Sequence, residues 1–140
     1  MKNKETWKYL EPHIGDQIRV KRPHYYHHGI YIGCGMVIHY DEGVIGVFSN
    51  PRLIKVIKTT MQEYLHGGYP EVRTYSRKEI KNKKSVEEII EYANSHLGQS
   101  GYDYIKHNCE HFSNECVFGI SYSTQSEKFK EQIRKLTKNG

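Results

Sequence analysis

The chain is short of several features that would decide its class at once. No apolar run approaches the ~18 residues that a membrane-spanning helix requires. The stretch from Met1 to Glu11 is charged and has no apolar signal-peptide core, which predicts a cytoplasmic protein. Three cysteines are an odd number and unsuited to a disulfide framework in a reducing compartment. At least one of them is therefore expected to serve chemistry.

The excess of positive over negative charge is also modest, at a net +5 with histidine neutral. Such an excess favours contact with anionic surfaces, but leaves nucleic acid, anionic lipid and mere solubility open. What the chain does contain is enough apolar and aromatic material, with 36% hydrophobic residues and 12 tyrosines, for one domain with a modest core.

Strand patterns come first along the chain, and helix patterns come mostly later. The stretches with β-branched or alternating character are Gln17–Lys21, Gly29–Gly33, Met36–Tyr40, Val44–Phe48, Leu53–Lys58 and Val72–Tyr75. This order predicts an α+β fold, in which a mainly antiparallel β-sheet packs with helices.

Helix starts are marked by capping patterns. These patterns occur at Thr60–Glu63, Ser85–Glu88, Asn108 and Thr124–Glu127. The helix after Asn108 should run to about Phe118 and end at Gly119, whereas Lys81–Lys84 is expected to be a solvated basic loop. The expected division of the chain is an N-terminal segment (1–14), a catalytic domain (15–120) and a basic helical tail (121–140).

Cys109 is the candidate nucleophile. If Asn108 caps the helix, Cys109 lies in its first turn, where unpaired backbone N–H groups and the helix dipole favour a thiolate. The same N–H groups could hold a developing oxyanion. Cys116 lies on the same helix face and is expected to pack in the core, and Cys34 is expected to be a turn residue. A buried, inert thiol is the alternative interpretation of Cys109.

A nucleophilic thiol needs an imidazole base and a group that orients that base. A three-residue hairpin loop at Gly33-Cys34-Gly35 would pair Ile32 with Met36 and Ile30 with Ile38. That register puts Ile30, Ile32, Met36 and Ile38 on one core face, and His27, Gly29, Tyr31, Val37 and His39 on the other. His27, rather than His28, then shares a face with His39 and is the predicted base.

Two other uses of these residues stay open. The histidines could be scattered along a solvated strand. Alternatively, a zinc site could be built from His24, His27, His39, His111 and Cys109, although their spacing matches no common zinc motif.

The segment Asn108-Cys109-Glu110-His111-Phe112 resembles the N-C-E-H-F signature of the lecithin:retinol acyltransferase (LRAT-like) family. The resemblance spans roughly 15–119, and its upstream part is carried by short motifs in the same order. These motifs are Gly15-Asp16-Gln17-Ile18, Arg22-Pro23, His27-x-x-Ile30-Tyr31-Ile32-Gly33, Val37-Ile38-His39, and Tyr102 seven residues before Cys109.

The resemblance implies a circularly permuted relative of the papain-like NlpC-type fold, with the nucleophile at the N-terminus of a helix. It implies that Cys109 takes an acyl group from a phospholipid or other acyl ester as a thioester. His27 would be the base, His39 the orienting or polarising residue, and Tyr102 and Asn108 supporting residues. Water, or an acceptor hydroxyl or amine, would then receive the acyl group. No cofactor, metal or nucleic-acid partner is expected.

The tail departs from many animal members of the family, which end in a hydrophobic membrane anchor. Here it is basic, and predicts at most a transient, peripheral contact with an anionic membrane. Its cationic residues are Lys128, Lys130, Arg134, Lys135 and Lys138. Two other functions compete with acyl transfer: a cysteine peptidase or amidase of NlpC-like type, and a non-catalytic binding module.

Overall fold

A computed structural model describes residues 5–40, 53–103 and 107–138. Its strands are β1 (Thr6–Lys8), β2 (Gln17–Lys21), β3 (Tyr26–Gly33), β4 (Met36–Tyr40), β5 (Val56–Thr60) and β6 (Glu71–Thr74). Its helices are α1 (Met61–Leu65), α2 (Arg77–Asn82), α3 (Val86–Ser95), α4 (Cys109–Phe118) and α5 (Thr124–Lys138).

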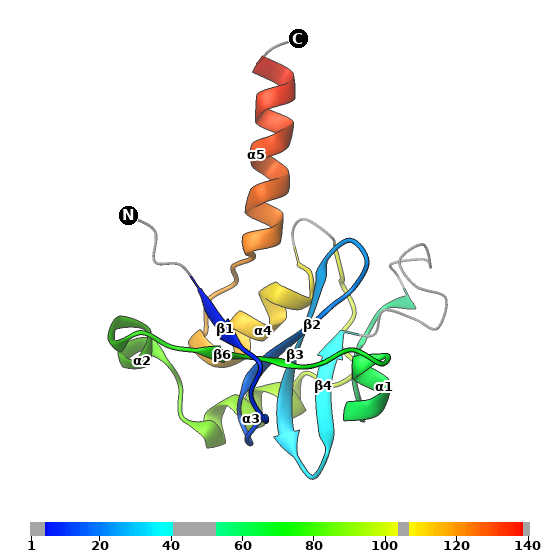
Figure 1. Cartoon of the computed structure of the whole chain (residues 1–140), viewed down its shortest axis with the longest axis vertical. Helices are drawn as coiled ribbons and strands as arrows, with labels where there is room; N and C mark the ends of the chain where they lie inside the picture. Colours follow the sequence, from blue (N-terminus) through cyan, green and yellow to red (C-terminus); the bar gives the residue numbers. More distant parts are fainter. Residues whose placement is uncertain (1–4, 41–52, 104–106, 139–140) are drawn as a thin grey trace.

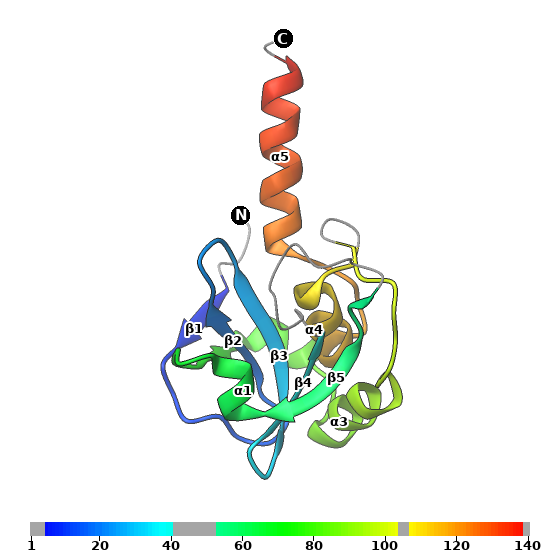
Figure 2. The ribbon, with the colours of Figure 1, turned by 90° about the vertical axis from the view of Figure 1, so that its right-hand side faces the viewer.

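The described strands form a six-stranded sheet in the order β1-β6-β2-β3-β4-β5, and every pairing is antiparallel. Helices α3 and α4 lie on one side of this sheet, and α1 packs near β4 and β5 (Figures 1 and 2). The predicted α+β fold with an antiparallel sheet is confirmed.

Local sequence signals placed most helix ends correctly. Thr60, Ser85 and Asn108 are the N-caps of α1, α3 and α4, and Gly119 ends α4 in the left-handed conformation. The cap of the last helix lies one residue earlier than expected, because Ser123 rather than Thr124 accepts the N–H of Ser126, and the helix itself begins at Thr124. A hydroxyl or amide side chain at each cap satisfies N–H groups that the helix itself leaves unpaired.

Other expectations need correction. The expected loop Lys81–Lys84 begins inside α2, which Ser76 caps through the same Ser-x-x-Glu pattern as the other helices. The fifth strand is shifted to Val56–Thr60, and β1 was not foreseen, because a three-residue edge strand carries too little pattern. The predicted strand Val44–Phe48 lies outside the described residues.

The β3–β4 hairpin reaches the predicted register by a different turn. Ile30 pairs with Ile38 as predicted, but Met36 pairs with Gly33 rather than with Ile32. The expected three-residue loop is therefore wrong. The turn is Cys34-Gly35, with φ values of 52° and 71°, and the register shifts between Tyr31 and Gly33. Two positive φ values are typical of the type I′ turn that suits strand twist.

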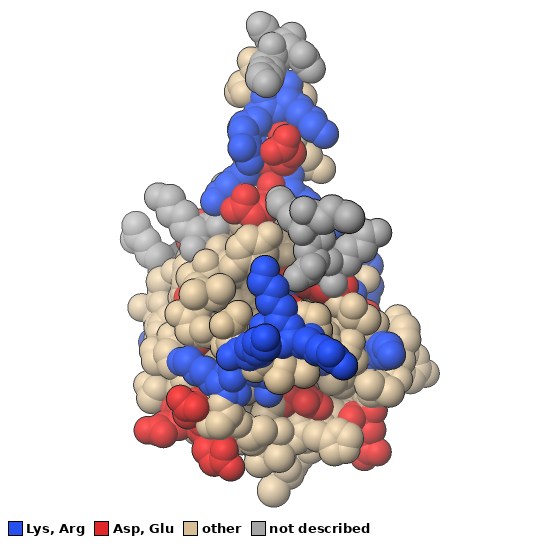
Figure 3. All heavy atoms as spheres, turned by 90° about the vertical axis from the view of Figure 1, so that its left-hand side faces the viewer, with Lys and Arg blue, Asp and Glu red and all other residues tan. Residues whose placement is uncertain are grey.

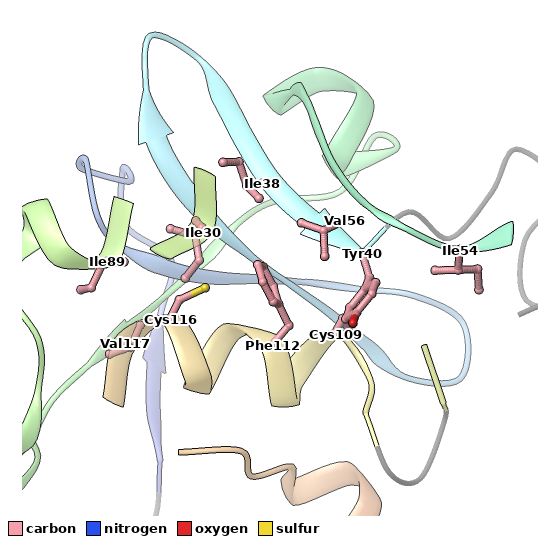
Figure 4. Packing of buried hydrophobic residues seen from close by; sticks show 11 residues of the cluster. Ile30, Ile38, Tyr40, Ile54, Val56, Ile89, Cys109, Phe112, Cys116 and Val117 are labelled. Carbon is pink, nitrogen blue, oxygen red and sulfur yellow. The ribbon is translucent and has the colours of Figure 1, made fainter. Parts of the chain in front are cut away.

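Both faces of the sheet are covered by other elements. The face that carries His27 and His39 is therefore buried, and the alternative of histidines scattered along a solvated strand is wrong. The main core lies between β3, β4, β5 and helices α3 and α4 (Figure 4). It contains Ile30, Ile38, Tyr40, Ile54, Val56, Ile89, Ala93, Cys109, Phe112, Cys116 and Val117. A second core lies under α1 and contains Ile18, Val20, Val37, Tyr64 and Val72.

Helix α5 projects away from the body along the long axis of the molecule (Figure 1). Its Ile133 and Leu136 are 42% and 75% exposed. Within the residues that the structure describes, none of the helices combines the length and the apolar character needed to cross a membrane.

Candidate active site

The predicted nucleophile stands at the first position of α4. The Asn108 carboxamide oxygen accepts the N–H groups of Glu110 (2.9 Å) and His111 (3.1 Å), and His111 Nδ1 accepts the N–H of Asn108 (2.9 Å). This reciprocal cap fixes the start of the helix at Cys109. The cap uses the first-turn N–H groups of Glu110 and His111, so neither of these two is available to an oxyanion.

The cap is also bonded to the base of α5. Asn108 Nδ2 donates to the hydroxyls of Ser123 (3.1 Å) and Ser126 (2.9 Å). Ser123 in turn donates to the carboxylate of Glu110 (2.8 Å), which is almost fully buried. Glu110 thus has a structural partner beside the nucleophile, and the projecting helix is tied to the start of α4.

Cys109 is buried in the main core, with its side chain beside Tyr40 and Phe112 (Figure 4). Its Sγ lies 3.8 Å from the carbonyl oxygen of Tyr26 on β3. Tyr26 directly precedes His27, so α4 brings the thiol to the strand that carries the predicted base. Of the other cysteines, Cys116 is fully buried and burial raises the pKa of its thiol, whereas Cys34 is exposed in the hairpin turn.

The two predicted histidines meet on adjacent strands. His27 Nε2 lies 2.9 Å from His39 Nδ1, and the two rings are nearly perpendicular. His39 Nδ1 is also 3.0 Å from its neighbour's carbonyl at Tyr40, and its Nε2 lies 2.8 Å from Thr59 Oγ1 on β5. His27 and His39 therefore lie within reach of each other, as the register argument predicted.

Burial holds His27 in its neutral form. Loss of water around the ring lowers the pKa of His27 well below 6.5, and charge interactions with His39 and Arg22 lower it further. A neutral imidazole has a free lone pair near neutral pH, which a general base requires.

His28 points to the opposite face of the sheet. Its ring meets the edge of Trp7 at 5.4 Å between centroids, and its Nδ1 has no hydrogen-bond partner among the described residues. Burial lowers the pKa of His28 as well. The two adjacent histidines are thus equally buried but differ in surroundings, since only His27 contacts a second imidazole.

Tyr64 on α1 supports the histidine pair, and sequence reasoning missed it. Its hydroxyl donates to the carbonyl oxygen of His27 at 2.6 Å, and its ring lies 5.3 Å from the His27 ring and 5.0 Å from the His39 ring. Gly29 leaves the room for it, because a Cβ there would lie 2.9 Å from Tyr64 Cε1. The Arg22 guanidinium donates a hydrogen bond to the Tyr64 carbonyl at 2.7 Å and so fixes the position of α1.

Tyr102 lies against the main core, with its ring 5.3 Å from the ring of Tyr40. Tyr40 is bonded in turn to His107 Nδ1 (2.7 Å), and His107 Nε2 is 2.7 Å from Glu115 on α4. Burial raises the pKa of Tyr40 to about 12, so its hydroxyl keeps its proton. These contacts make Tyr102 part of the packing around β4 and α4.

The residues of the alternative zinc site do not converge. His24 is exposed before β3, and His111 is committed to the cap of α4. In the described ranges, no group of three or more His, Cys, Asp or Glu side chains is arranged to hold a metal ion.

A large cavity of about 960 Å³ lies elsewhere, between the β1 edge of the sheet, α2 and the C-terminal half of α4. None of the predicted site residues lines it.

Comparison with known proteins agrees with the resemblance. The model of the lecithin retinol acyltransferase family matches residues 10–122. Lecithin retinol acyltransferase of Rattus norvegicus is 30% identical, over 89% of this chain and 62% of the relative. Phospholipase A and acyltransferase 1 of Rattus norvegicus is 32% identical, over 84% of this chain and 74% of the relative. Phospholipase A and acyltransferase 4 of Homo sapiens is 31% identical, over 93% of this chain and 84% of the relative.

The chain spans about three fifths of the length of the lecithin retinol acyltransferases that it matches. The family model covers most of the chain and includes the strands and the helix that carry Cys109, His27 and His39. The chain therefore belongs to the lecithin retinol acyltransferase family.

Proposed function

We propose that the protein is a thiol-dependent acyltransferase or acyl hydrolase that forms an acyl-thioester on Cys109. The observation that carries the proposal is the capped start of α4, which holds Sγ of Cys109 3.8 Å from the carbonyl of Tyr26, the residue that precedes His27 in β3. The names of the relatives, lecithin retinol acyltransferase and phospholipase A and acyltransferase, support a phospholipid as the acyl donor.

Catalysis needs the tautomer in which His27 Nδ1 carries no proton. In that tautomer the Nε2–H of His27 donates to His39 Nδ1, and the Nε2–H of His39 donates to Thr59 Oγ1. His27 Nδ1 is then the unprotonated nitrogen and serves as the base. His39 acts by fixing this tautomer and stabilising the imidazolium that forms on His27.

In the first half-reaction His27 takes the proton of the Cys109 thiol, and the thiolate attacks the ester carbonyl of the donor. A C–S bond forms, and the oxyanion is held by the N–H of Cys109. Collapse of the tetrahedral intermediate breaks the ester C–O bond, and the His27 imidazolium protonates the leaving alkoxide. The products are the acyl-thioester and a lysophospholipid.

In the second half-reaction His27 removes a proton from water, or from an acceptor hydroxyl or amine. The activated oxygen or nitrogen attacks the thioester, the C–S bond breaks, and the Cys109 thiolate leaves and regains its proton from His27. With water the product is a fatty acid, and with an acceptor it is an ester or an amide. The same residues thus support both hydrolysis and transfer.

Helix α5 supplies a means of reaching a lipid surface. Its exposed Ile133 and Leu136 lie beside the exposed cations Lys130, Arg134 and Lys135. A basic amphipathic helix of this kind binds the interface of an anionic membrane. The hydrogen bonds that Asn108 donates to Ser123 and Ser126 would then hold the start of α4 at a fixed distance from that surface.

The test is intact-mass spectrometry after incubation with a phosphatidylcholine, in a Cys34→Ser background that removes the exposed thiol. We expect a mass increase of one acyl group that is absent from Cys109→Ala. A matched pair, His27→Gln and His28→Gln, replaces two equally buried imidazoles. His27→Gln should abolish the adduct and His28→Gln should retain it. An adduct that survives Cys109→Ala, or equal loss in the histidine pair, would contradict the proposed roles.

A further inference from the structure

Unpartnered polar atoms gather around Trp7. In the described parts of the chain, four buried side-chain nitrogen or oxygen atoms have no hydrogen-bond partner, and three of them are Arg19 Nε, His28 Nδ1 and Arg73 Nε. All three residues surround Trp7. Arg19 lies 4.5 Å and Arg73 6.0 Å from its ring centroid, and His28 meets it at 5.4 Å.

Such atoms are costly, because each has lost its water without gaining a partner. Their clustering at one place on one sheet face therefore calls for an explanation. Register explains how they meet: Arg19 is paired with both His28 and Glu71, and Trp7 with Arg73, so these side chains share a face.

This cluster forms part of the wall of the 960 Å³ cavity. Arg19, Arg73 and Trp7 line it from the sheet, and α2, α4 and the start of α5 supply the other walls. The apolar contribution comes from Trp7, Phe118, Ile120 and Tyr122. Ile120 is 64% and Tyr122 41% exposed, so apolar surface continues from the cavity to its rim. The volume is typical of a small-molecule site.

The charge of the lining is positive, with four basic and two acidic side chains and hence a net +2. The two acidic residues, Glu5 and Glu79, are both paired with Arg73. Lys78 and Lys128 form no ion pair with a carboxylate of the described residues. Figure 3 looks at the side of the molecule that carries α2 and shows Lys and Arg side chains gathered near its centre.

We propose that this cavity binds an anionic amphiphile, a molecule with an alkyl chain that ends in a carboxylate or a phosphate. The aromatic and aliphatic walls take the chain. Lys78 and Lys128 attract the anionic group, and a small rotation of Arg19 or Arg73 presents an unused N–H to its oxygen. The site is separate from Cys109, and the proposal does not depend on the proposed function.

Trp7 makes the test specific, because it is the single tryptophan of the chain and lines the cavity. The probes are dodecanoate, dodecyl phosphate and the neutral dodecyl maltoside, each below its critical micelle concentration. They are titrated into the full chain carrying Cys109→Ala, which prevents acyl chemistry at the thiol. We expect a saturable change in Trp7 fluorescence with the anionic probes and a response to the maltoside at least tenfold weaker in affinity.

Two variants on the same helix provide the matched comparison. Lys78 lines the cavity, whereas Lys81 is also exposed on α2 but does not line it. Lys78→Glu should raise the dissociation constant about fivefold, equivalent to about 1 kcal/mol, and Lys81→Glu should leave it unchanged. Ile120→Asp, at an exposed rim position, should weaken both anionic probes.

The outcomes separate the two anions. Saturation by both supports a general anionic amphiphile, and saturation by one alone identifies the head group as carboxylate or phosphate. Equal binding of the maltoside, a response that does not saturate, or equal effects of Lys78→Glu and Lys81→Glu would overturn the proposal. Because the assay is carried out without the nucleophile, a failure here leaves the thioester proposal standing, and the reverse also holds.

Discussion

Variants of Tyr64 can measure how much this residue stabilises the His27–His39 pair. It is 1% exposed, and its hydroxyl donates to the carbonyl of His27 at 2.6 Å. Tyr64→Phe keeps the ring and removes the hydroxyl, with its short bond to the His27 carbonyl and its longer one, 3.5 Å, to the Ile18 carbonyl. The expected loss in the free energy of unfolding is about 1 kcal/mol, because the buried His27 carbonyl loses a hydrogen-bond donor. Tyr64→Leu also removes the ring packing on His27 and His39, and should cost about 3 kcal/mol.

The assay is urea unfolding followed by circular dichroism, combined with the alkylation rate of Cys109 in the Cys34→Ser background. With a slope near 1–3 kcal/mol per molar urea for a small domain, Tyr64→Phe should lower the midpoint by about 0.5 M. Tyr69→Phe is the matched control, because that tyrosine lies between α1 and β6, close to Tyr64 in sequence, and is 79% exposed. Its midpoint should equal that of the parent.

The alkylation rate distinguishes positioning from mere stability. Below the unfolding midpoint, Tyr64→Leu should slow alkylation near neutral pH severalfold, because His27 loses the ring that fixes its orientation. A mildly destabilising change elsewhere should leave this rate unaltered. Equal midpoints for Tyr64→Phe and Tyr69→Phe, or a parental alkylation rate in Tyr64→Leu, would refute this account of Tyr64.

Two further predictions concern pH and lipid. Because the pKa of His27 is lowered on folding, the unfolded chain binds its proton first as pH falls, so stability is complete above about pH 6.5 and declines below it. The free energy of unfolding, obtained from urea titrations across this range, should decline with a slope of up to ~1.4 kcal/mol per pH unit from this residue. His27→Gln should flatten the decline, and an unchanged slope would contradict a buried neutral His27. In vesicle flotation, the protein should bind vesicles that contain phosphatidylserine better than pure phosphatidylcholine, and charge reversal at Arg134 and Lys135 should abolish the difference. Equal flotation with both vesicle types would exclude the role of α5.

The sequence by itself determined the local features of this protein. Asn108 predicted the start of α4 at Cys109, because a side-chain amide before an apolar run satisfies the first helical N–H groups. The alternation in β3 and β4 predicted that His27 and His39 meet, because a strand's side chains alternate between two faces. These conclusions depend on residues close together along the chain, where periodicity and capping are reliable guides.

Only the tertiary structure decided what covers each face. Tyr64 reaches His27 across 37 residues of sequence, and no local pattern marks it for that place. Likewise, Arg19, His28 and Arg73 gather around Trp7 because β1 and β6 pair at the sheet edge. Contacts of this kind follow from strand order and helix docking. Many sequences satisfy the same local rules, so packing between distant segments had to be seen before the second face of the site and the Trp7 cavity could be found.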